Sequence, residues 1–324
     1  MIRIEETEGT CGSEQFAEDV LTGLSAFPKS LPCKYIYDGE GDRLFREITE
    51  QPEYYLTRTE YSILLENSGR IAARLGEGPF NMVELGPGDG GKARVLMEEF
   101  SERGLEYRFV PIDICESSLE HIIERSEKLF SDVPVDGLVA DYHDGLSWLA
   151  RSSSCRNFVM FLGSNIGNFE PEAAMSFLKN LREALRPGDM VLIGFDMKKD
   201  FEVLNRAYND ERGVTDRFHL NLLGRINREL GGRFRMDTFE YSGHYDPSSG
   251  AIKSYLVSNT DQTVHVDGLG TSFSFRAWEP VHTESSYKYT PSDIEEMAEG
   301  AGFRIVEDYT DPNGFFVDSL WVAQ

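Results

Sequence analysis

The sequence predicts an α/β protein with a parallel sheet that is covered by helices on both faces. Five short apolar segments between residues 80 and 197 alternate with segments of helical periodicity, and this alternation is typical of parallel sheets. A glycine-rich loop, "GPGDGG", joins the first apolar segment to the first helix. The chain ends in two apolar segments around an Asp-Pro-Asn-Gly turn, which predicts an antiparallel hairpin that closes the sheet.

The elements of this sheet follow one another in a regular order. The predicted strands cover residues 80–85, 107–113, 135–141, 157–163 and 189–197. The predicted helices cover 92–104, 117–130 and 171–188, and Pro187-Gly188 ends the last of them. Thr290 followed by Pro291 predicts the N-cap of a final helix before the hairpin.

The rest of the chain predicts a second domain. Residues 14–25 favour a short amphipathic helix, 199–230 a long helix, and 233–289 antiparallel strands. We therefore expect residues 61–198 and 288–324 to form the domain with the parallel sheet. Residues 1–60 and an insertion after the fifth strand, 199–287, form a second α+β domain.

Composition excludes several classes of partner. The net charge of −24 argues against a nucleic acid or an anionic membrane surface as a partner, since both need a basic face. The four cysteines, Cys11, Cys33, Cys115 and Cys155, form no C-x-x-C motif and favour the reducing cytoplasm. We expect a cytoplasmic monomer without a membrane-spanning helix.

The glycine-rich loop predicts a site for a nucleoside-containing ligand. Its spacing is Glu84-x-Gly86-x-Gly88-x-Gly90, and Gly91 also completes the pattern G-x-G-x-x-G. Glycine permits a tight turn and lets a ligand approach the backbone at the carboxyl end of the first strand. A nicotinamide or flavin dinucleotide is one alternative ligand. A second alternative is a loop that only turns a strand into a helix.

Two carboxylates at the ends of later strands support the ligand site. Asp113 ends the second predicted strand, where a carboxylate can bind both hydroxyls of a ribose. Asp141 ends the third strand, where it can accept a hydrogen bond from an adenine amino group, and Tyr142 can flank the base. The alternative for Asp141 is an ordinary turn residue.

The loop E-x-G-x-G-x-G, with its acidic residue inside the first strand, resembles the class I S-adenosylmethionine (SAM)-dependent methyltransferases, which have a Rossmann-like fold. In that family the loop faces the methionine part of the ligand. The resemblance implies SAM as the cofactor. The insertion after the fifth strand and the terminal hairpin suit this family better than a nicotinamide enzyme.

Four further stretches are similar to one narrower family, the histidine Nα-methyltransferases of ergothioneine biosynthesis. They are "KSLPCKYIYDGEGDRLFREITEQPEYYLTRTE" (29–60), "MFLGSNIGNF" (160–169), "AYND" (207–210) and "HTESSYKYT" (282–290). The resemblance spans nearly the whole chain. It implies Nα-methylation of L-histidine to N,N,N-trimethylhistidine (hercynine).

The resemblance also implies a role for individual residues. For the amino acid, Tyr37 (the catalytic candidate) and Gly163 orient the α-amine, Asn168 and Tyr208 clamp the carboxylate, and Tyr54, Glu284 and Ser286 form the imidazole pocket. For the cofactor, the implied contacts are Gly86, Gly88, Lys92, Asp113, Asp141 and Tyr142.

This chemistry explains the residue types. A sulfonium methyl group is already a strong electrophile, so we expect no metal and no nucleophilic side chain. The protein must place a neutral amine in line with the methyl group. A free α-amine is mostly protonated at neutral pH, so a proton must leave, to water or to a nearby oxygen. Tyr37 can hydrogen-bond the amine, and Glu284 can accept an imidazole N–H.

Different interpretations stay open at single positions. Tyr54 alone favours an aromatic core and Asn168 a turn. Glu284 and Ser286 share one face of a strand and would more often be solvated. Ser254 departs from the family, which carries a larger apolar residue there, so tryptophan or another amino acid remains an alternative substrate. The sequence also admits a binding protein without catalysis or a nicotinamide-dependent oxidoreductase.

Overall fold

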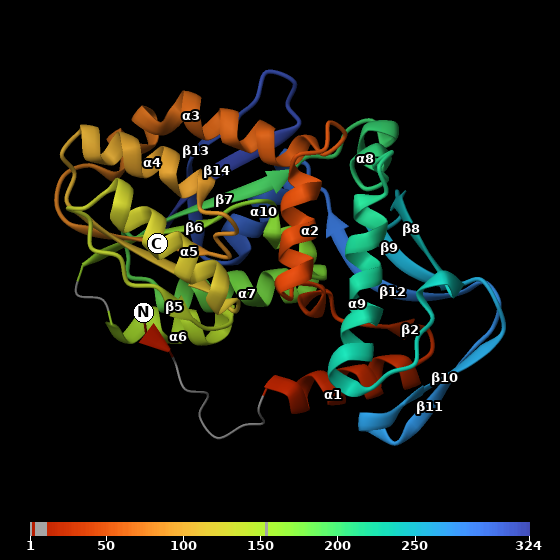
Figure 1. Ribbon diagram of the computed structural model, residues 1–324. Coiled ribbons are helices and arrows are strands. Elements are labelled where there is room, and N and C mark those ends of the chain that lie inside the picture. Colours follow the sequence, from red (N-terminus) through yellow and green to blue (C-terminus); the bar gives the residue numbers. More distant parts are fainter. Residues whose placement is uncertain (1, 4–11, 153–154) are drawn as a thin grey trace. The chain divides into compact units, whose positions relative to one another are not determined.

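The computed structural model describes residues 2–3, 12–152 and 155–324 (Figure 1). The chain divides into two compact units. Unit 1 takes its residues from 1–5, 56–199 and 287–324, and unit 2 from 6–55 and 200–286. It stays a prediction that unit 1 binds the cofactor and unit 2 binds the substrate.

The main sheet lies in unit 1. In the described part of the chain, eight strands form it in the order β1-β5-β4-β3-β6-β7-β14-β13. The strands are β1 (Ile2–Arg3), β3 (Phe80–Leu85), β4 (Tyr107–Asp113), β5 (Leu138–Val139), β6 (Arg156–Phe161), β7 (Met190–Asp196), β13 (Phe303–Thr310) and β14 (Phe316–Ala323). The first six strands in this order pair in parallel, whereas β14 is antiparallel to β7 and β13 is antiparallel to β14. The predicted parallel sheet with a closing hairpin is confirmed.

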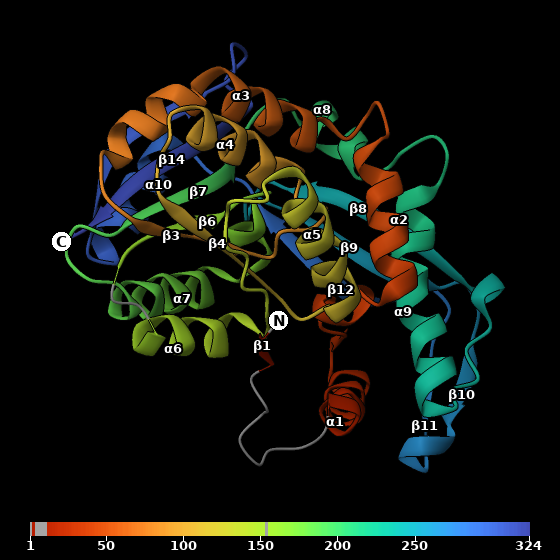
Figure 2. The same cartoon turned by 60° about the vertical axis from the view of Figure 1, so that its left-hand side comes forward.

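Helices cover both faces of this sheet. One face packs against α3 (Tyr55–Leu75), α4 (Gly91–Glu102) and α5 (Glu116–Leu129). The other face packs against α6 (Tyr142–Ser152), α7 (Pro171–Ala184) and α10 (Pro291–Gly300), as Figure 1 and Figure 2 show. Successive residues of β3 alternate between the two cores: Met82 lies in the first and Val83 in the second. Burial on both faces explains why the strand sequences are apolar throughout.

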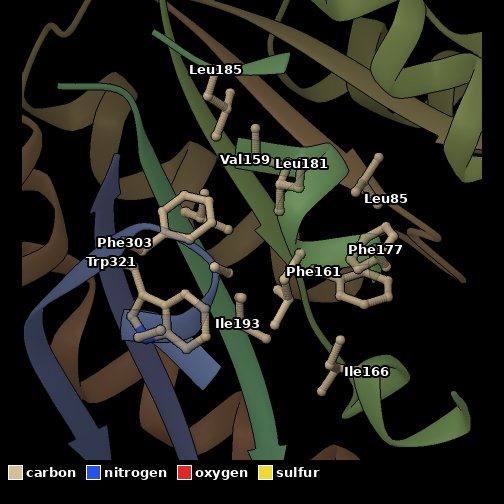
Figure 3. Packing of buried hydrophobic residues seen from close by; sticks show 14 of the residues in the cluster. Leu85, Val159, Phe161, Ile166, Phe177, Leu181, Leu185, Ile193, Phe303 and Trp321 are labelled. Carbon is tan, nitrogen blue, oxygen red and sulfur yellow. The ribbon is translucent and has the colours of Figure 1, made fainter. Parts of the chain in front are cut away.

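The core on the α7 side anchors the C-terminal hairpin (Figure 3). Trp321 of β14 is fully buried and stacks on Phe195 of β7, with ring centroids 5.8 Å apart. Its Nε1–H donates to Ser319 Oγ at 2.7 Å, so its polar atom is satisfied. Phe303 of β13 contacts the same indole at 5.6 Å. These aromatic contacts join the hairpin to β7.

Unit 2 has a smaller sheet of its own. Its strand order is β2-β12-β9-β8, and β10 and β11 form a separate ribbon. The strands are β2 (Lys29–Ser30), β8 (Phe239–Asp246), β9 (Ala251–Ser258), β10 (Gln262–Val266), β11 (Thr271–Phe275) and β12 (Glu279–Tyr287), and the helices are α1 (Gly12–Ser25), α2 (Gly39–Thr49), α8 (Phe201–Ala207) and α9 (Val214–Leu230). Helix α2 packs against α9. Every helix in the described residues is too short or too polar to traverse a bilayer.

Two predicted elements differ from the structure. The long helix predicted over 199–230 is instead two helices, α8 and α9. The Asp210 side chain accepts the backbone N–H groups of Val214 and Thr215 and so caps the start of α9. Gly213, at φ +63°, makes the turn between them. The strand predicted over 135–141 is reduced to Leu138–Val139.

Further elements were not predicted, and they include α2, α6 and β1. Helix α6 begins where Asp141 accepts the Asp144 N–H at 2.9 Å. Strand β1 pairs in parallel with β5 at the edge of the main sheet. Of the cysteines, Cys33, Cys115 and Cys155 are in the thiol form, while Cys11 lies outside the described residues.

Candidate active site

The glycine loop after β3 adopts the conformation that its sequence requires. Gly86, Gly88 and Gly90 have φ values of +67°, +59° and +69°, which disfavour residues with a side chain. A Cβ on Gly86 would lie 2.7 Å from the hydroxyl oxygen of Tyr142. A Cβ on Gly88 would meet no atom within 4 Å. Tyr142 therefore excludes a side chain at Gly86, whereas the backbone at Gly88 faces open space.

Glu84 shows that this loop suits a cationic ligand. Its side chain is buried at the end of β3, and its Oε2 has no hydrogen-bond partner among the described residues. Burial, reinforced by Asp89, Glu60 and Asp113 and opposed by Lys92, raises the pKa of Glu84 to about 8. A buried acceptor beside an open glycine turn fits a ligand that carries an ammonium and a sulfonium group, as SAM does.

The remaining predicted cofactor residues lie at the same edge of the sheet. Asp113 ends β4, and its Oδ1 accepts the Cys115 N–H at 2.8 Å. Asp141 follows β5 and is exposed. Because β3, β4 and β5 are parallel neighbours, their carboxyl ends meet there. The ring of Tyr142 packs against Phe161, with centroids 5.2 Å apart, and its hydroxyl points toward the glycine loop.

Lys92 and Gly163 meet at a buried carboxylate that was not predicted. Lys92 Nζ forms an ion pair with Glu60 Oε2 at 2.5 Å. The Gly163 N–H donates to the same carboxylate, at 2.7 Å to Oε1 and 3.0 Å to Oε2. Burial lowers the pKa of Lys92, but the negative charge of Glu60 outweighs it and raises that pKa above its ordinary value. Because Gly163 donates its N–H to Glu60, this N–H is not available to a ligand. The Gly163 carbonyl oxygen is the backbone group of this residue that can accept a hydrogen bond from an amine.

The segment after Gly163 is held in a strained turn. Ser164 has φ +57°, uncommon for a residue with a side chain, and its Oγ accepts the Asp196 N–H at 3.0 Å. A 3-10 turn from Asn165 to Asn168 follows. Asn168 is half-buried at its end. This hydrogen bond fixes the position of Ser164, just before the 3-10 turn. It thereby also constrains the position of Asn168 at the end of the turn.

In unit 2, aromatic rings bring three predicted residues together. The ring of Tyr37 meets Phe45 and Phe218 edge-on, with centroids 5.7 Å and 5.3 Å away. Tyr54 lies 6.2 Å from Phe45 and 6.2 Å from Tyr208. Tyr37, Tyr54 and Tyr208 thus belong to one aromatic cluster, which presents phenol groups among apolar rings.

Strand β12 supplies the polar residues next to this cluster. The Tyr208 hydroxyl hydrogen-bonds Ser286 Oγ at 2.8 Å. Glu284 is only 8% exposed and Ser286 5%, so neither is an ordinary solvated residue. The predicted carboxylate clamp and the predicted imidazole pocket therefore share one hydrogen bond in this unit.

His219 is a neighbour of Glu284 that was not predicted. The Thr283 hydroxyl donates to the Ser254 carbonyl oxygen at 3.1 Å, so its oxygen accepts from His219 Nδ1–H, also at 3.1 Å. His219 Nε2 then carries the lone pair and lies 3.8 Å from Glu284 Oε2. Burial, together with His282, lowers the pKa of His219 to about 3. The imidazole is therefore neutral and gives Glu284 no counter-charge.

Ser254, the position that departs from the family, is buried on β9. Its hydroxyl lies 3.1 Å from the Tyr241 hydroxyl oxygen. Tyr241 in turn stacks on His219, with centroids 4.5 Å apart. Ser254 thus belongs to the polar network behind Glu284. In the described residues, no three His, Cys, Asp or Glu side chains are grouped as metal ligands.

The chain is similar to known proteins over nearly its whole length. Residues 16–323 match the family model described as "Histidine-specific methyltransferase, SAM-dependent". The chain is 39% identical to the histidine N-alpha-methyltransferase of Mycolicibacterium smegmatis, over 96% of this chain and 95% of that protein. It is 31% identical to ergothioneine biosynthesis protein 1 of Schizosaccharomyces pombe, over 86% of this chain but only 37% of that protein.

Among solved structures, the magnesium protoporphyrin IX methyltransferase of Synechocystis with bound SAM is similar at a TM-score of 0.45. It is 10% identical over 90% of this chain and 95% of that one, a likeness too distant to carry an argument. The family match covers both units, including the glycine loop of unit 1 and the β12 residues of unit 2. The chain therefore belongs to the family of SAM-dependent, histidine-specific methyltransferases.

Proposed function

We propose that this protein transfers methyl groups from SAM to the α-amine of L-histidine until the amine carries three. The observation that carries the proposal is the buried Glu284 carboxylate on β12, beside a neutral His219. A buried carboxylate favours a ligand that donates an N–H to it. The names of the relatives in Mycolicibacterium smegmatis and Schizosaccharomyces pombe support the same substrate and pathway.

The cofactor contacts are proposed for unit 1. Gly86 and Gly88 accommodate SAM against the backbone, and Lys92 is a further contact of the same ligand. Asp113 binds its ribose, and Asp141 and Tyr142 contact its adenine. Bound SAM supplies an electrophilic methyl group. Glu84, whose buried Oε2 has no hydrogen-bond partner in the part of the chain that the structure describes, provides a hydrogen-bond acceptor for the cationic part of the ligand.

The amino-acid contacts are proposed residue by residue. Tyr37 and the Gly163 carbonyl hydrogen-bond the α-amine and so direct its lone pair. Asn168 and the Tyr208 hydroxyl bind the carboxylate with neutral donors. Glu284 accepts the imidazole N–H, Ser286 bonds the other ring nitrogen, and Tyr54 forms an aromatic wall.

The protein's own contribution is orientation and loss of a proton. The α-amine must give up a proton before each transfer, because a protonated nitrogen has no lone pair. Tyr37 accepts a hydrogen bond from the remaining N–H, while the released proton passes to water. The second transfer repeats this step with the one N–H that is left. The third transfer needs only the loss of a proton, because the neutral dimethylated amine has no N–H to donate. Methylation ends at three methyl groups, since the trimethylated nitrogen has neither a proton to lose nor a lone pair.

One incubation tests the substrate and the extent of reaction. The purified protein is mixed with SAM and all twenty amino acids, and the products are separated by mass. We expect histidine alone to gain methyl groups and its trimethylated form to accumulate. Methylation of tryptophan in place of histidine would contradict the substrate assignment, and accumulation of the monomethyl form would contradict the trimethyl stage.

The location, oligomeric state and partners of the protein are part of the same proposal. We propose a cytoplasmic monomer with no nucleic acid or membrane partner, supported by the net charge of −24. Light scattering after gel filtration measures the mass, which we expect to be that of one 36.7 kDa chain. A mass of two chains would contradict the monomer.

A further inference from the structure

Glu60 of α3 connects two segments that the proposed function assigns to different ligands. Its carboxylate is fully buried and accepts the Gly163 N–H with both oxygens. The same carboxylate is the ion-pair partner of Lys92. Gly163 follows β6 and is assigned to the amino acid, whereas Lys92 lies on α4 and is assigned to the cofactor. One side chain therefore fixes a contact residue for each of the two reactants.

The surrounding fold is shaped to admit this carboxylate. Gly194 lies in the interior of β7, where glycine weakens a strand. A Cβ on Gly194 would lie 2.3 Å from Glu60 Oε1. Gly163 itself has φ +78°, and a Cβ there would lie 3.1 Å from Lys92 Nζ. Two glycines thus make room for Glu60 and Lys92.

Asp318 of β14 completes the group. It pairs in register with Gly194, is fully buried, and receives no hydrogen bond at either oxygen from the described residues. Burial, and then the negative charge of Glu60, raise the pKa of Asp318 well above its ordinary value, against the opposing effect of Lys92. In its neutral form the Asp318 carboxyl can donate a hydrogen bond to the Glu60 carboxylate. With Asp318 neutral, Lys92 carries one positive charge and Glu60 one negative charge, so the buried group has no net charge.

We infer that Glu60 is a positioning residue for methyl transfer. Its carboxylate holds the Gly163 turn and the Lys92 ammonium in one arrangement, and the Asp318 carboxyl holds Glu60 in place. This inference rests on the proposed function, which assigns Gly163 to the amine and Lys92 to SAM. Glu60 touches neither reactant in this scheme and acts through the two residues that it binds.

The alternative is a buried ion pair that only stabilises the core. Such pairs are weak contributors to stability, because desolvation offsets their attraction. A positioning role predicts instead that kcat depends on the orientation of Glu60, because misplacement of reacting groups lowers the rate of transfer itself. The two roles therefore differ in kcat, measured on folded protein.

A pair of substitutions at Asp318 separates the two roles. Asp318→Asn keeps a neutral donor for Glu60, whereas Asp318→Leu has the same number of side-chain heavy atoms and no donor. Both leave the Glu60–Lys92 ion pair in place. We expect Asp318→Asn to keep the wild-type kcat and Asp318→Leu to lose roughly ten- to a hundredfold in kcat. Calorimetric titration should give a SAM affinity for both variants close to that of wild type.

Glu60→Gln is the direct test, and the Asp318 pair remains decisive where Glu60→Gln fails to fold. Folded Glu60→Gln should lose at least as much kcat as Asp318→Leu. Wild-type kcat in Asp318→Leu or in folded Glu60→Gln, or an equal loss in Asp318→Asn and Asp318→Leu, would overturn the inference. Wild-type protein is assayed first. Its failure to methylate histidine would count against the proposed function, and the Asp318 comparison would then use whichever amino acid it does methylate.

Discussion

At the scale of a single residue, Glu284 is the group to which we assign the choice of substrate. It is nearly fully buried on β12, and its neighbour His219 is neutral and presents a lone pair rather than a proton. A buried carboxylate in these surroundings gains most from a ligand that supplies an N–H. Among aromatic amino acids, histidine and tryptophan have ring N–H groups, and histidine has the smaller ring. Selection between them therefore depends on the shape of the pocket as well as on Glu284.

Replacing Glu284 should separate substrate recognition from cofactor binding. We expect Glu284→Ala to lower kcat/KM for histidine by roughly ten- to a hundredfold, the effect of losing a hydrogen bond to a charged group. SAM affinity should stay at the wild-type value. Initial rates with histidine and tryptophan check this, and tryptophan turnover should rise relative to histidine. Glu240→Ala, at an exposed position of the same sheet, is the control, and equal histidine rates in both variants would refute the imidazole pocket.

His219 should make stability depend on pH in a specific window. Its folded-state pKa of about 3 lies below the unfolded value of 6.5, so the unfolded chain binds a proton first as the pH falls. Its contribution is fully present above pH 6.5 and is lost progressively down to about pH 3. In this window wild type should lose about 1.4 kcal/mol per pH unit more than His219→Gln does.

Urea unfolding at pH 6.5, 5.5 and 4.5 measures this difference. The contributions of the remaining titrating groups are common to both proteins and cancel. His143→Gln, at an exposed histidine of α6, should keep the wild-type dependence on pH. Parallel curves for wild type and His219→Gln would show that His219 is not buried in its neutral form.

At the scale of elements, the carboxyl end of β7 is held by buried charges. Asp196 is fully buried and pairs with Lys199 and with Lys288, whose Nζ lies 2.9 Å from Asp196 Oδ2. Burial opposes the charge of Lys199 and lowers its pKa to about 8 despite the attraction of Asp196. The segment after β7 and the segment after β12 are therefore joined to one carboxylate. The backbone bond from Lys198 N–H to the Tyr289 carbonyl joins them as well, at 2.8 Å.

Removing that carboxylate should destabilise unit 1. Asp196→Asn removes the carboxylate that pairs with both buried ammonium groups, and breaking a buried pair in this way costs about 3–5 kcal/mol. Urea unfolding at neutral pH measures the loss. Glu98→Gln removes the carboxylate of a solvent-exposed ion pair with Arg94 and should cost less than about 1 kcal/mol. Equal losses in the two variants would mean that the Asp196 group is hydrated.

The elements with strong periodicity were predictable from sequence. The strands of the main sheet and the helix that starts at Thr290 follow from apolar runs and capping residues. The predicted cap at Thr290 is confirmed as a capping box with Asp293. Helix α6 was missed because Gly145 and three polar residues near its start resemble a turn, although Leu146 and Leu149 have helical spacing. Strand β1 is too short for any periodicity to reveal it.

Individual site residues could be proposed from the sequence only where a motif or a family resemblance points to them. The glycine loop follows from spacing, and the substrate residues followed from resemblance. Glu60, Asp318 and His219 lie far apart in sequence and become neighbours of site residues only through the fold. Each interrupts an apolar pattern with one polar residue, and no local rule distinguishes such a residue from a solvated one. Burial and hydrogen bonding, which only the structure provides, identify them.

At the scale of the whole molecule, the proposed contacts divide between the two units. The six residues proposed for the cofactor, from Gly86 to Tyr142, all lie in unit 1. A ligand that binds only the folded form of that unit stabilises it by mass action. The glycine loop alone also suits a dinucleotide, so thermal stabilisation distinguishes SAM from NAD without any assay of methyl transfer.

Tryptophan fluorescence can follow unit 1 by itself in a suitable variant. Trp321 and Trp148 belong to unit 1, whereas Trp278 belongs to unit 2 and is 69% exposed. In Trp278→Phe, the emission of the two remaining tryptophans reports the unfolding of unit 1. We expect SAM at 100 times its dissociation constant to stabilise unit 1 by about 2.7 kcal/mol. NAD at the same concentration should leave the melting curve unchanged.

The control for this experiment is Asp113→Asn in the same Trp278→Phe background. Asparagine keeps an oxygen for the Cys115 N–H that Asp113 accepts at 2.8 Å, so the turn after β4 should persist. It removes the charge that we assign to the ribose hydroxyls, and each charge-assisted hydrogen bond lost costs about 1.5–3 kcal/mol of binding. The stabilisation by the same concentration of SAM should therefore largely disappear. Undiminished stabilisation would place the ribose elsewhere, and stabilisation by NAD equal to that by SAM would assign the glycine loop to a dinucleotide.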